Sequence, residues 1–284
     1  MVEQTLDPEN LARWIGRQEE MRDVIEPRTA RSMQAVLDRA PSLQPGDPLP
    51  PLWHWLYFPI IVPQSELGRD GHPKLGGFLP PVALPRRMWA GGRLGFERAL
   101  RIGEAATRRS TIKGVQLKDG RSGPLCFVTV RHEVFAGDDF CFWEEHDIVY
   151  REDPRPDAPV PMPLEAPSGE DWARRIEPGP VMLFRYSALT FNGHRIHYDR
   201  QYCTEVEGYP GLVFHGPLTA TLLFDLALER NPGCWVSGFE FRAVSPLFDL
   251  EPFTLAGCRK DDRAELWART PQGGLAMTAK AEFN

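Results

Sequence analysis

The run from Pro217 to Arg230 constrains the fold most, because its composition suits a helix only in a protein interior. "PLTATLLFDLALER" is apolar on nearly every face of a 3.6-residue helix, and only two threonines and two acidic residues interrupt it. An amphipathic surface helix would carry one apolar stripe, so this helix is predicted to be buried. The proline in its first turn and Asn231-Pro232-Gly233 at its end predict a length of about 14 residues, or about 21 Å.

Sequence runs typical of β-strands provide the material to bury such a helix. Four follow it: "CWVSGFEFRAVSPL", "PFTLAGCRK", "RAELWART" and "GLAMTAKAEF". Four similar runs separated by turn residues lie between residues 93 and 150. Each set predicts an antiparallel meander. A short buried helix wrapped by a curved antiparallel sheet is the hot-dog arrangement. Two such units predict an α+β double hot dog, in which the two sheets, each wrapping a buried helix, pair with each other.

Proline content suggests where the chain divides. Residues 151–171, "REDPRPDAPVPMPLEAPSGED", are polar and proline-rich and are predicted to be a linker. It would join an N-terminal half, residues 1–150, to a C-terminal half, residues 172–284. Within the first half, residues 41–91 contain too many prolines for long regular elements but are rich in aromatics, so a packed irregular layer is expected.

Two further segments carry secondary-structure predictions. The first forty residues are predicted to be helical, with helix starts at Asp7-Pro8-Glu9 and at Pro27. The second of these helices is expected to direct four side chains towards the core: Met33, Val36, Leu37 and Ala40. The apolar run from residue 181 to 191 is predicted to be a buried strand.

Charge and cysteine usage exclude several classes of protein. The net charge of the 284 residues is −6, with both signs mixed along the chain, so no basic patch predicts nucleic-acid binding. No stretch approaches the roughly 20 apolar residues that span a bilayer, and "MVEQTLDPEN" does not resemble a signal peptide. The five cysteines are odd in number and form no CxxC pair, which favours a reducing compartment. A cytoplasmic protein that binds neither membrane nor nucleic acid is expected.

Histidines are the strongest chemical signal, because three of the seven gather near the buried helix. His194 and His197 would share a face if the turn after Asn192 is helical, and His215 directly precedes the helix. Three imidazoles could ligate zinc or could simply cap a turn. No acidic pattern supports a metal, so none is expected. An imidazole with a pKa near neutrality can instead take and return a proton, while the Asn192 amide holds a water.

His215-Gly216-Pro217 adds a second feature suited to catalysis. The first backbone N–H groups of a helix lack intrahelical partners and carry the positive end of its dipole. A glycine at this place lets a carbonyl group approach the backbone. The combination predicts a site that stabilises the oxygen of an enolate-like thioester transition state.

These motifs resemble those of the MaoC-like hydratases and dehydratases. "YSALTFNGHRIHYD" and "HGPL", with "PLPPLWHWLYF", "FLPP" and "PRRMWAGG" in the first half, are similar to one subgroup. It contains hydroxyacyl-thioester dehydratase type 2 and the mesaconyl-C4-CoA and itaconyl-CoA hydratases. The resemblance spans residues from about 48 to 284. It implies a double hot dog that hydrates an enoyl thioester or dehydrates a 3-hydroxyacyl thioester, with a non-catalytic N-terminal half that shapes the acyl tunnel.

The resemblance also implies roles for individual residues. His197 falls on the acid–base histidine, and Gly216 on the glycine whose N–H binds the thioester carbonyl. Asn192 stands where the wider family has an aspartate, so it could orient the water but could not accept its proton. His194 is implied to hold the water or the substrate tail. Asp199 is near enough in sequence to orient a histidine.

The expected substrate is a short dicarboxylyl-CoA, mesaconyl-C4-CoA or itaconyl-CoA, with CoA as part of the substrate and no cofactor. Arg195 is the first candidate for the free carboxylate of the acyl group, with Arg185 and Arg200 as alternatives. Arg86 and Arg87 are candidates for the CoA phosphates, and His215 for substrate contact. Either a monomer or a homodimer is compatible with the double fold.

Three alternatives remain open at this stage. The first is a 3-hydroxyacyl dehydratase that acts on an acyl carrier protein thioester. The second is a hot-dog thioesterase, for which Asp225 would be the carboxylate on the buried helix. The third is a non-catalytic acyl-CoA sensor, which would need an attached DNA-binding element.

Overall fold

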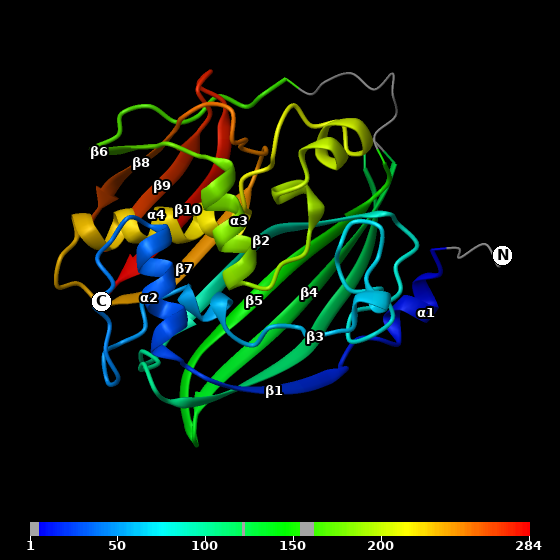
Figure 1. The fold of residues 1–284 in the computed structure, drawn as a ribbon, viewed down its shortest axis with the longest axis horizontal. Coiled ribbons are helices and arrows are strands. Elements are labelled where there is room, and N and C mark those ends of the chain that lie inside the picture. The colour runs from blue at the N-terminus through cyan, green and yellow to red at the C-terminus, as the bar shows by residue number, and fades with distance from the viewer. Residues whose placement is uncertain (1–5, 121–122, 154–161) are drawn as a thin grey trace.

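The computed structural model describes residues 6–120, 123–153 and 162–284. Ten strands in these residues form one antiparallel sheet, in the order β1-β3-β4-β5-β2-β7-β10-β9-β8-β6 (Figure 1). The strands are β1 (Gln18–Val24), β2 (Arg86–Phe96), β3 (Ala105–Gly120), β4 (Gly123–Ala136), β5 (Asp139–Arg151), β6 (Trp172–Ile176), β7 (Val236–Ala243), β8 (Phe253–Lys260), β9 (Arg263–Arg269) and β10 (Leu275–Phe283).

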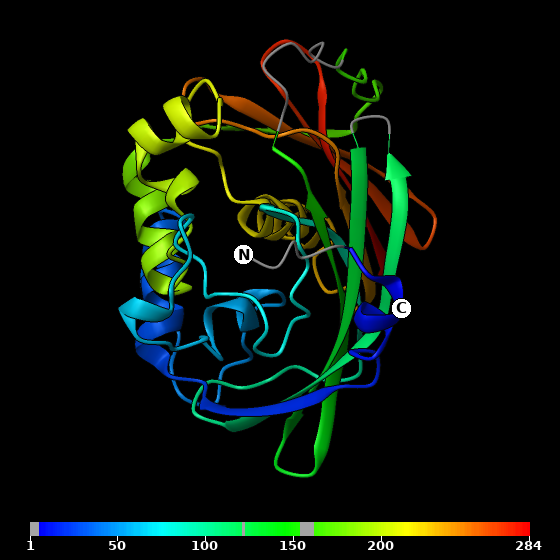
Figure 2. The same cartoon turned by 90° about the vertical axis from the view of Figure 1, so that its right-hand side faces the viewer.

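Helices pack on one face of this sheet. In Figure 2 the sheet lies on the right, α4 lies against its inner face, and α2 and α3 form an outer layer on the left. The helical elements are α1 (Pro8–Ala12), α2 (Pro27–Val36), α3 (Pro180–Leu189) and α4 (Gly216–Arg230), with the shorter turns η1 (Trp53–Leu56), η2 (Gln64–Glu66), η3 (Arg195–His197) and η4 (Tyr202–Val206).

The two meanders join where β2 pairs with β7. Five residue pairs connect these strands, from Gly91 opposite Arg242 to Gly95 opposite Gly238. A β-carbon on Gly91 would lie 2.5 Å from the carbonyl oxygen of Phe241, so a side chain here would push the strands apart. The predicted pairing of the two sheets therefore occurs through a seam that requires glycine.

Helix α4 matches the prediction from its sequence. Every residue from Leu218 to Ala227 is buried. The helix packs against β7, β8, β9 and β10. Its N-terminus opens towards the site described below.

The N-terminal half differs from the C-terminal half in what covers its concave face. In place of a long helix it has η1, in which His54 Nε2 and Trp55 Nε1 both donate hydrogen bonds to the buried Glu144 carboxylate. Prolines at 48, 50 and 51 precede this turn and Pro59 follows it, which prevents a longer helix. The inner face of this half therefore carries polar side chains.

Two secondary-structure predictions were wrong. The predicted strand at residues 181–191 is α3, which begins at Pro180 and buries Leu183, Tyr186 and Ser187 at helical spacing. A short apolar run does not distinguish a strand from a buried helix by periodicity alone. The first forty residues are not all helical, because β1 lies between α1 and α2.

Other boundaries shift by smaller amounts. Helix α2 begins at Pro27 as predicted and buries Met33 and Val36, but Ala40 lies beyond its end and is exposed. Strand β2 begins at Arg86, within the segment predicted to be irregular. The division into two halves and a linker stays a prediction; β5 ends at Arg151, β6 begins at Trp172, and residues 154–161 of the predicted linker lie outside the described residues.

Candidate active site

The turn after α3 brings the first two predicted histidines together. Its backbone reverses at Phe191, which has a positive φ of 51°. The Asn192 side-chain oxygen then accepts a hydrogen bond of 3.0 Å from the backbone N–H of His194. Asn192 therefore stabilises the turn that leads into η3, and the rings of His194 and His197 meet edge to face, 5.4 Å apart.

His197 is held so that only one of its ring nitrogens remains unbound. Nδ1 donates a 2.7 Å hydrogen bond to the carbonyl oxygen of Val213. Because a carbonyl only accepts, the proton of the neutral ring lies on Nδ1 and Nε2 has a lone pair. Burial lowers the pKa of His197 to about 4, so the ring is neutral at pH 7. Such a ring can accept a proton.

His215 and Gly216 lie directly beside this imidazole. The His215 ring stacks on the His197 ring with centroids 3.6 Å apart. Its Nε2 shares a 2.9 Å hydrogen bond with Ser187 Oγ, and burial keeps its pKa well below the ordinary value. Gly216 is the first residue of α4 and has open space where a β-carbon would point. The predicted histidine cluster and helix start are therefore adjacent.

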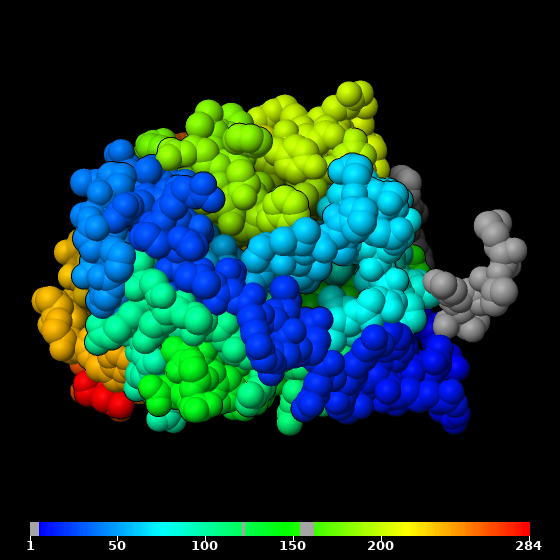
Figure 3. Space-filling model, turned by 60° about the horizontal axis from the view of Figure 1, so that its bottom comes forward, coloured from blue at the N-terminus to red at the C-terminus, as the bar shows by residue number. Residues whose placement is uncertain are grey.

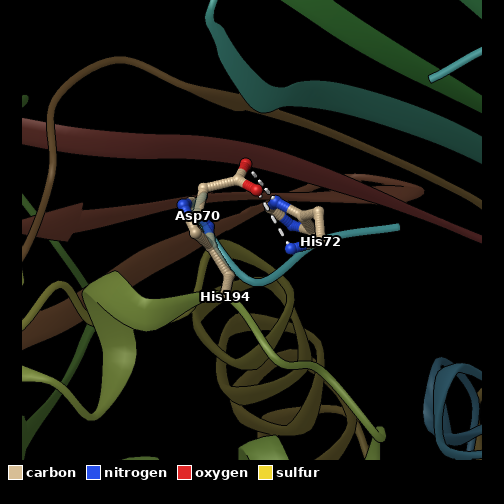
Figure 4. A group of neighbouring side chains, drawn as sticks. All are labelled: Asp70, His72 and His194. Carbon is tan, nitrogen blue, oxygen red and sulfur yellow. Dashed lines mark hydrogen bonds and ion pairs between the residues drawn. The ribbon is translucent and has the colours of Figure 1, made fainter. Parts of the chain in front are cut away.

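A loop of the N-terminal half contributes two residues that sequence reasoning missed. His72 Nδ1 donates a 2.8 Å hydrogen bond to Asp70 Oδ2, and the His72 ring lies 4.1 Å from the His194 ring (Figure 4). The loop is attached to the turn through its backbone, since the Arg195 N–H donates to the Asp70 carbonyl at 2.9 Å. A β-carbon on Gly71 would overlap the carbonyl oxygen of Gly193.

The only local sequence signal for this pair was weak. Asp70-Gly71-His72-Pro73 is a turn sequence within a segment predicted to be irregular. An aspartate two residues before a histidine can bond its backbone, as the 3.0 Å bond from the His72 N–H to Asp70 Oδ1 shows. Nothing in the spacing connects this turn with residue 194.

The charges of this cluster follow from burial and hydrogen bonding. Burial lowers the pKa of His72, against the opposing effect of Asp70, and lowers that of His194 to about 2. Burial would raise the pKa of Asp70, but the hydrogen bonds from His72 outweigh it, so this pKa lies below its ordinary range. At pH 7 the cluster is therefore one carboxylate among neutral imidazoles.

Most of the candidate arginines are occupied in ion pairs. Arg195 binds Asp199 Oδ2 at 2.7 Å, and Arg200 binds Asp249 Oδ2 at 2.5 Å. Asp199 therefore pairs with an arginine, and no hydrogen bond joins it to a histidine within the described ranges.

Arg86 and Arg185 are also engaged. Arg86 is buried and pairs with Asp153 and Glu207, so its charge is already balanced, and its role at the CoA phosphates stays a prediction. Arg185 donates to the carbonyl oxygen of Ala35. Neither Arg87 nor Arg185 has a carboxylate within ion-pair distance in the described part of the chain, and of these two only Arg87 lines the cavity described next.

A cavity of about 2960 Å³ connects these groups. Both halves line it: Arg87, Trp89 and His146 come from the N-terminal half, and His197 and Gly216 from the C-terminal half. In Figure 3 the surface is hollowed between the segment coloured light blue to cyan and the blue β1 region. Residues of both halves therefore form one composite site, and a ligand can enter it from the surface.

One group among the described residues could hold a cation. The ligand atoms of Asp70, His72 and His194 lie within 4.8 Å of one another. Both carboxylate oxygens of Asp70, however, already accept hydrogen bonds from His72.

The structure contains, in its described ranges, no helix long and apolar enough to cross a membrane.

Comparisons with known proteins agree with this geometry. Residues 52–249 match the family model of hydroxyacyl-thioester dehydratase type 2. Mesaconyl-C(4)-CoA hydratase of Chloroflexus aurantiacus is 49% identical over 95% of this chain and 96% of its own. The mitochondrial hydroxyacyl-thioester dehydratase type 2 of Schizosaccharomyces pombe is 29% identical, covering 75% of this chain and 77% of its own.

Solved structures establish the fold. A MaoC-like dehydratase from Phytophthora capsici superposes with a TM-score of 0.72 at 12% identity, over 98% of both chains. A Mycobacterium tuberculosis protein described as a double hot dog has a TM-score of 0.57 at 14% identity, over 95% of this chain and 96% of its own. The predicted α+β double hot dog is confirmed, although in the described residues only the C-terminal half wraps a long buried helix, and the N-terminal half has η1 in its place. The chain belongs to the hydroxyacyl-thioester dehydratase type 2 family.

Proposed function

We propose that this protein is a hydro-lyase that adds water reversibly across the α,β double bond of an enoyl thioester. The observation that supports this best is the position of His197. Its Nε2 lone pair lies in a composite cavity, beside the start of a buried helix. The similarity to hydratases and dehydratases over most of the chain points to the same reaction class.

The chain's residues have complementary roles in hydration. His197 Nε2 takes a proton from water while the water oxygen bonds to the β-carbon. The π electrons of the double bond move towards the thioester carbonyl, whose oxygen gains negative charge. The Gly216 N–H, free at the start of α4, donates to that oxygen. His194 lines the same space and binds the water or the substrate tail.

The proposed substrate is a short dicarboxylyl-CoA, the class to which the substrate named for the 49% identical relative belongs. In such a thioester the free carboxylate lies only a few bonds from the double bond, so its cation must lie near the histidines. Arg87 lines this part of the cavity. Burial lowers the pKa values of His72 and His194, and the charge of Arg87 lowers them further, as expected for a cation in the same cavity. Arg87 is therefore a better candidate than Arg195.

Replacing Arg87 with methionine tests this assignment. Removing a charge-assisted hydrogen bond to the free carboxylate should lower kcat/KM for mesaconyl-C4-CoA about 10- to 100-fold. Crotonyl-CoA, which lacks that carboxylate, should be affected much less. Arg185→Met is the matched control, because Arg185 lies outside the cavity lining. An equal loss with both substrates would contradict the assignment.

The alternatives have less support in the described residues. Asp225, the carboxylate that a thioesterase would need, pairs with Arg39 at 2.9 Å and does not line the cavity. A sensor would need a DNA-binding element, but β1 separates α1 from α2. Dehydration of an acyl carrier protein thioester uses the same catalytic groups, so only the carrier would differ.

We propose that the reaction needs no metal, since His197 would supply the base and the Gly216 N–H the donor to the thioester oxygen. A spectroscopic screen of crotonyl-, mesaconyl-C4- and itaconyl-CoA tests the function as a whole. Loss of enoyl absorbance without release of free thiol is expected, and dialysis against a chelator should not change its rate. Thiol release would indicate hydrolysis, and no turnover of any of the three despite tight acyl-CoA binding would favour a sensor.

A further inference from the structure

Hydration requires two proton transfers at different atoms, one from water and one to the α-carbon. His197 is placed for the first. We infer that His72, oriented by Asp70, is the second acid–base group and exchanges protons with the substrate's α-carbon. This inference rests on the proposed function and assigns a catalytic role to the N-terminal half.

The pair has the geometry of an oriented imidazole. Asp70 Oδ1 accepts the His72 backbone N–H at 3.0 Å, and Oδ2 accepts Nδ1–H at 2.8 Å. The carboxylate thus fixes the ring orientation and leaves Nε2 unbound. Of the histidines around this turn, His72 alone bonds a carboxylate, since His197 bonds a carbonyl and His215 a hydroxyl. A proton on the His72 ring is therefore stabilised by an adjacent negative charge.

The pair is held at the reaction site. Both Asp70 and His72 belong to one loop. Its backbone contacts the turn that leads from α3 into η3, here called the catalytic turn, at Gly193 and Arg195. The His194 ring lies 4.1 Å from the His72 ring (Figure 4). Its centroid is 5.4 Å from that of the His197 ring. His72 and His197 also line one cavity. An enoyl group bound there would lie between two imidazoles.

The proton balance closes over one cycle. His197 Nε2 removes a proton from water as the oxygen–Cβ bond forms, and the π pair moves onto the thioester oxygen. The proton on His197 passes through water in the cavity to Nε2 of His72, which is neutral before the cycle begins. When the carbonyl re-forms, the α-carbon takes this proton from Nε2 of His72. One water is added and both imidazoles are restored; dehydration runs the same steps in reverse.

His72→Asn separates a chemical role from a structural one. The asparagine amide can still donate to Asp70 in place of Nδ1–H, but it has no group at the position of Nε2. We expect kcat to fall roughly 10²–10⁴-fold with little change in KM and in the thermal unfolding midpoint. Wild-type turnover by this variant would overturn the inference while leaving the proposed function intact. If wild-type protein itself hydrates no enoyl-CoA, the proposed function fails first.

Deuterium exchange identifies the atom that His72 serves. With the hydrated product in D₂O, His197→Asn should still exchange the α-hydrogen faster than it eliminates water, whereas His72→Asn should lose this exchange. Asp70→Asn should also lower kcat, and the double variant should be no slower than His72→Asn alone, because the pair acts as a unit. Exchange retained in His72→Asn would overturn the inference. The inference would also be overturned if a chelator abolished activity and a divalent cation restored it, because Asp70 and His72 would then be metal ligands.

Discussion

Replacement of His197 by alanine is expected to lower turnover of an enoyl-CoA roughly 10²–10⁴-fold, the range typical for loss of a general acid–base group. The reason is that Nε2 of this ring has a lone pair and that the ring lies beside the start of α4, where the thioester oxygen would lie. The measurement is steady-state turnover followed by enoyl absorbance. The fold should persist, because the surrounding core is built from α4 and the sheet.

His197→Asn provides the matched control for the loss of the Val213 hydrogen bond. Its amide can still donate where Nδ1 donates, at 2.7 Å, so the anchor of the turn is kept. Both variants should be equally slow although only alanine loses the anchor. Near-wild-type turnover of the asparagine variant would mean that His197 is structural, and the reaction would need another base.

Gly71→Ala is expected to reduce turnover about 10²-fold, although residue 71 has no chemical group to contribute. Gly71 has a φ of +87°, and its β-carbon would overlap the Gly193 carbonyl oxygen. An alanine there must adopt an unfavourable backbone conformation and also separate the loop from the catalytic turn. Displacements of about 1 Å in an active site can cost about 10²-fold. Turnover and thermal unfolding should be measured on the same preparation.

Gly76→Ala separates the backbone effect from the contact. Gly76 has a similar φ of +93°, but its nearest neighbour would lie 3.9 Å away, at Pro81. This variant should lose about 1–2 kcal/mol of stability and keep its turnover. If both alanines were equally active, close contact between the loop and the turn would not be needed for catalysis.

The sequence was most informative about features that are determined by residues close together in the chain. Helix α4 was predictable because an all-round apolar helix has no stable place at a surface, and His215 and Gly216 were predictable because they directly precede it. The placement of His197 beside them follows from its proximity in sequence to the same helix. The strand predicted at residues 181–191 was wrong because an apolar segment of this length satisfies either period.

What the sequence did not reveal depends on contacts between distant segments. Asp70 and His72 reach His194 across more than a hundred residues, through backbone contacts that leave no side-chain pattern. The sequence also did not reveal which arginines form ion pairs. Both Arg86 and Arg87 line the cavity, but Arg86 is neutralised by Asp153 and Glu207, far along the chain, whereas Arg87 has no ion pair in the described residues.

The seam between β2 and β7 has an evolutionary consequence. Identical subunits joined across such a seam would obey two-fold symmetry, and any substitution at one site would be repeated at the other. Here both partners are parts of one polypeptide, so each can change by itself. In the proposed mechanism one half provides the helix that polarises the thioester. Apart from the loop that holds Asp70 and His72, the other half can vary its polar wall and thereby alter selectivity without disturbing the proton transfers.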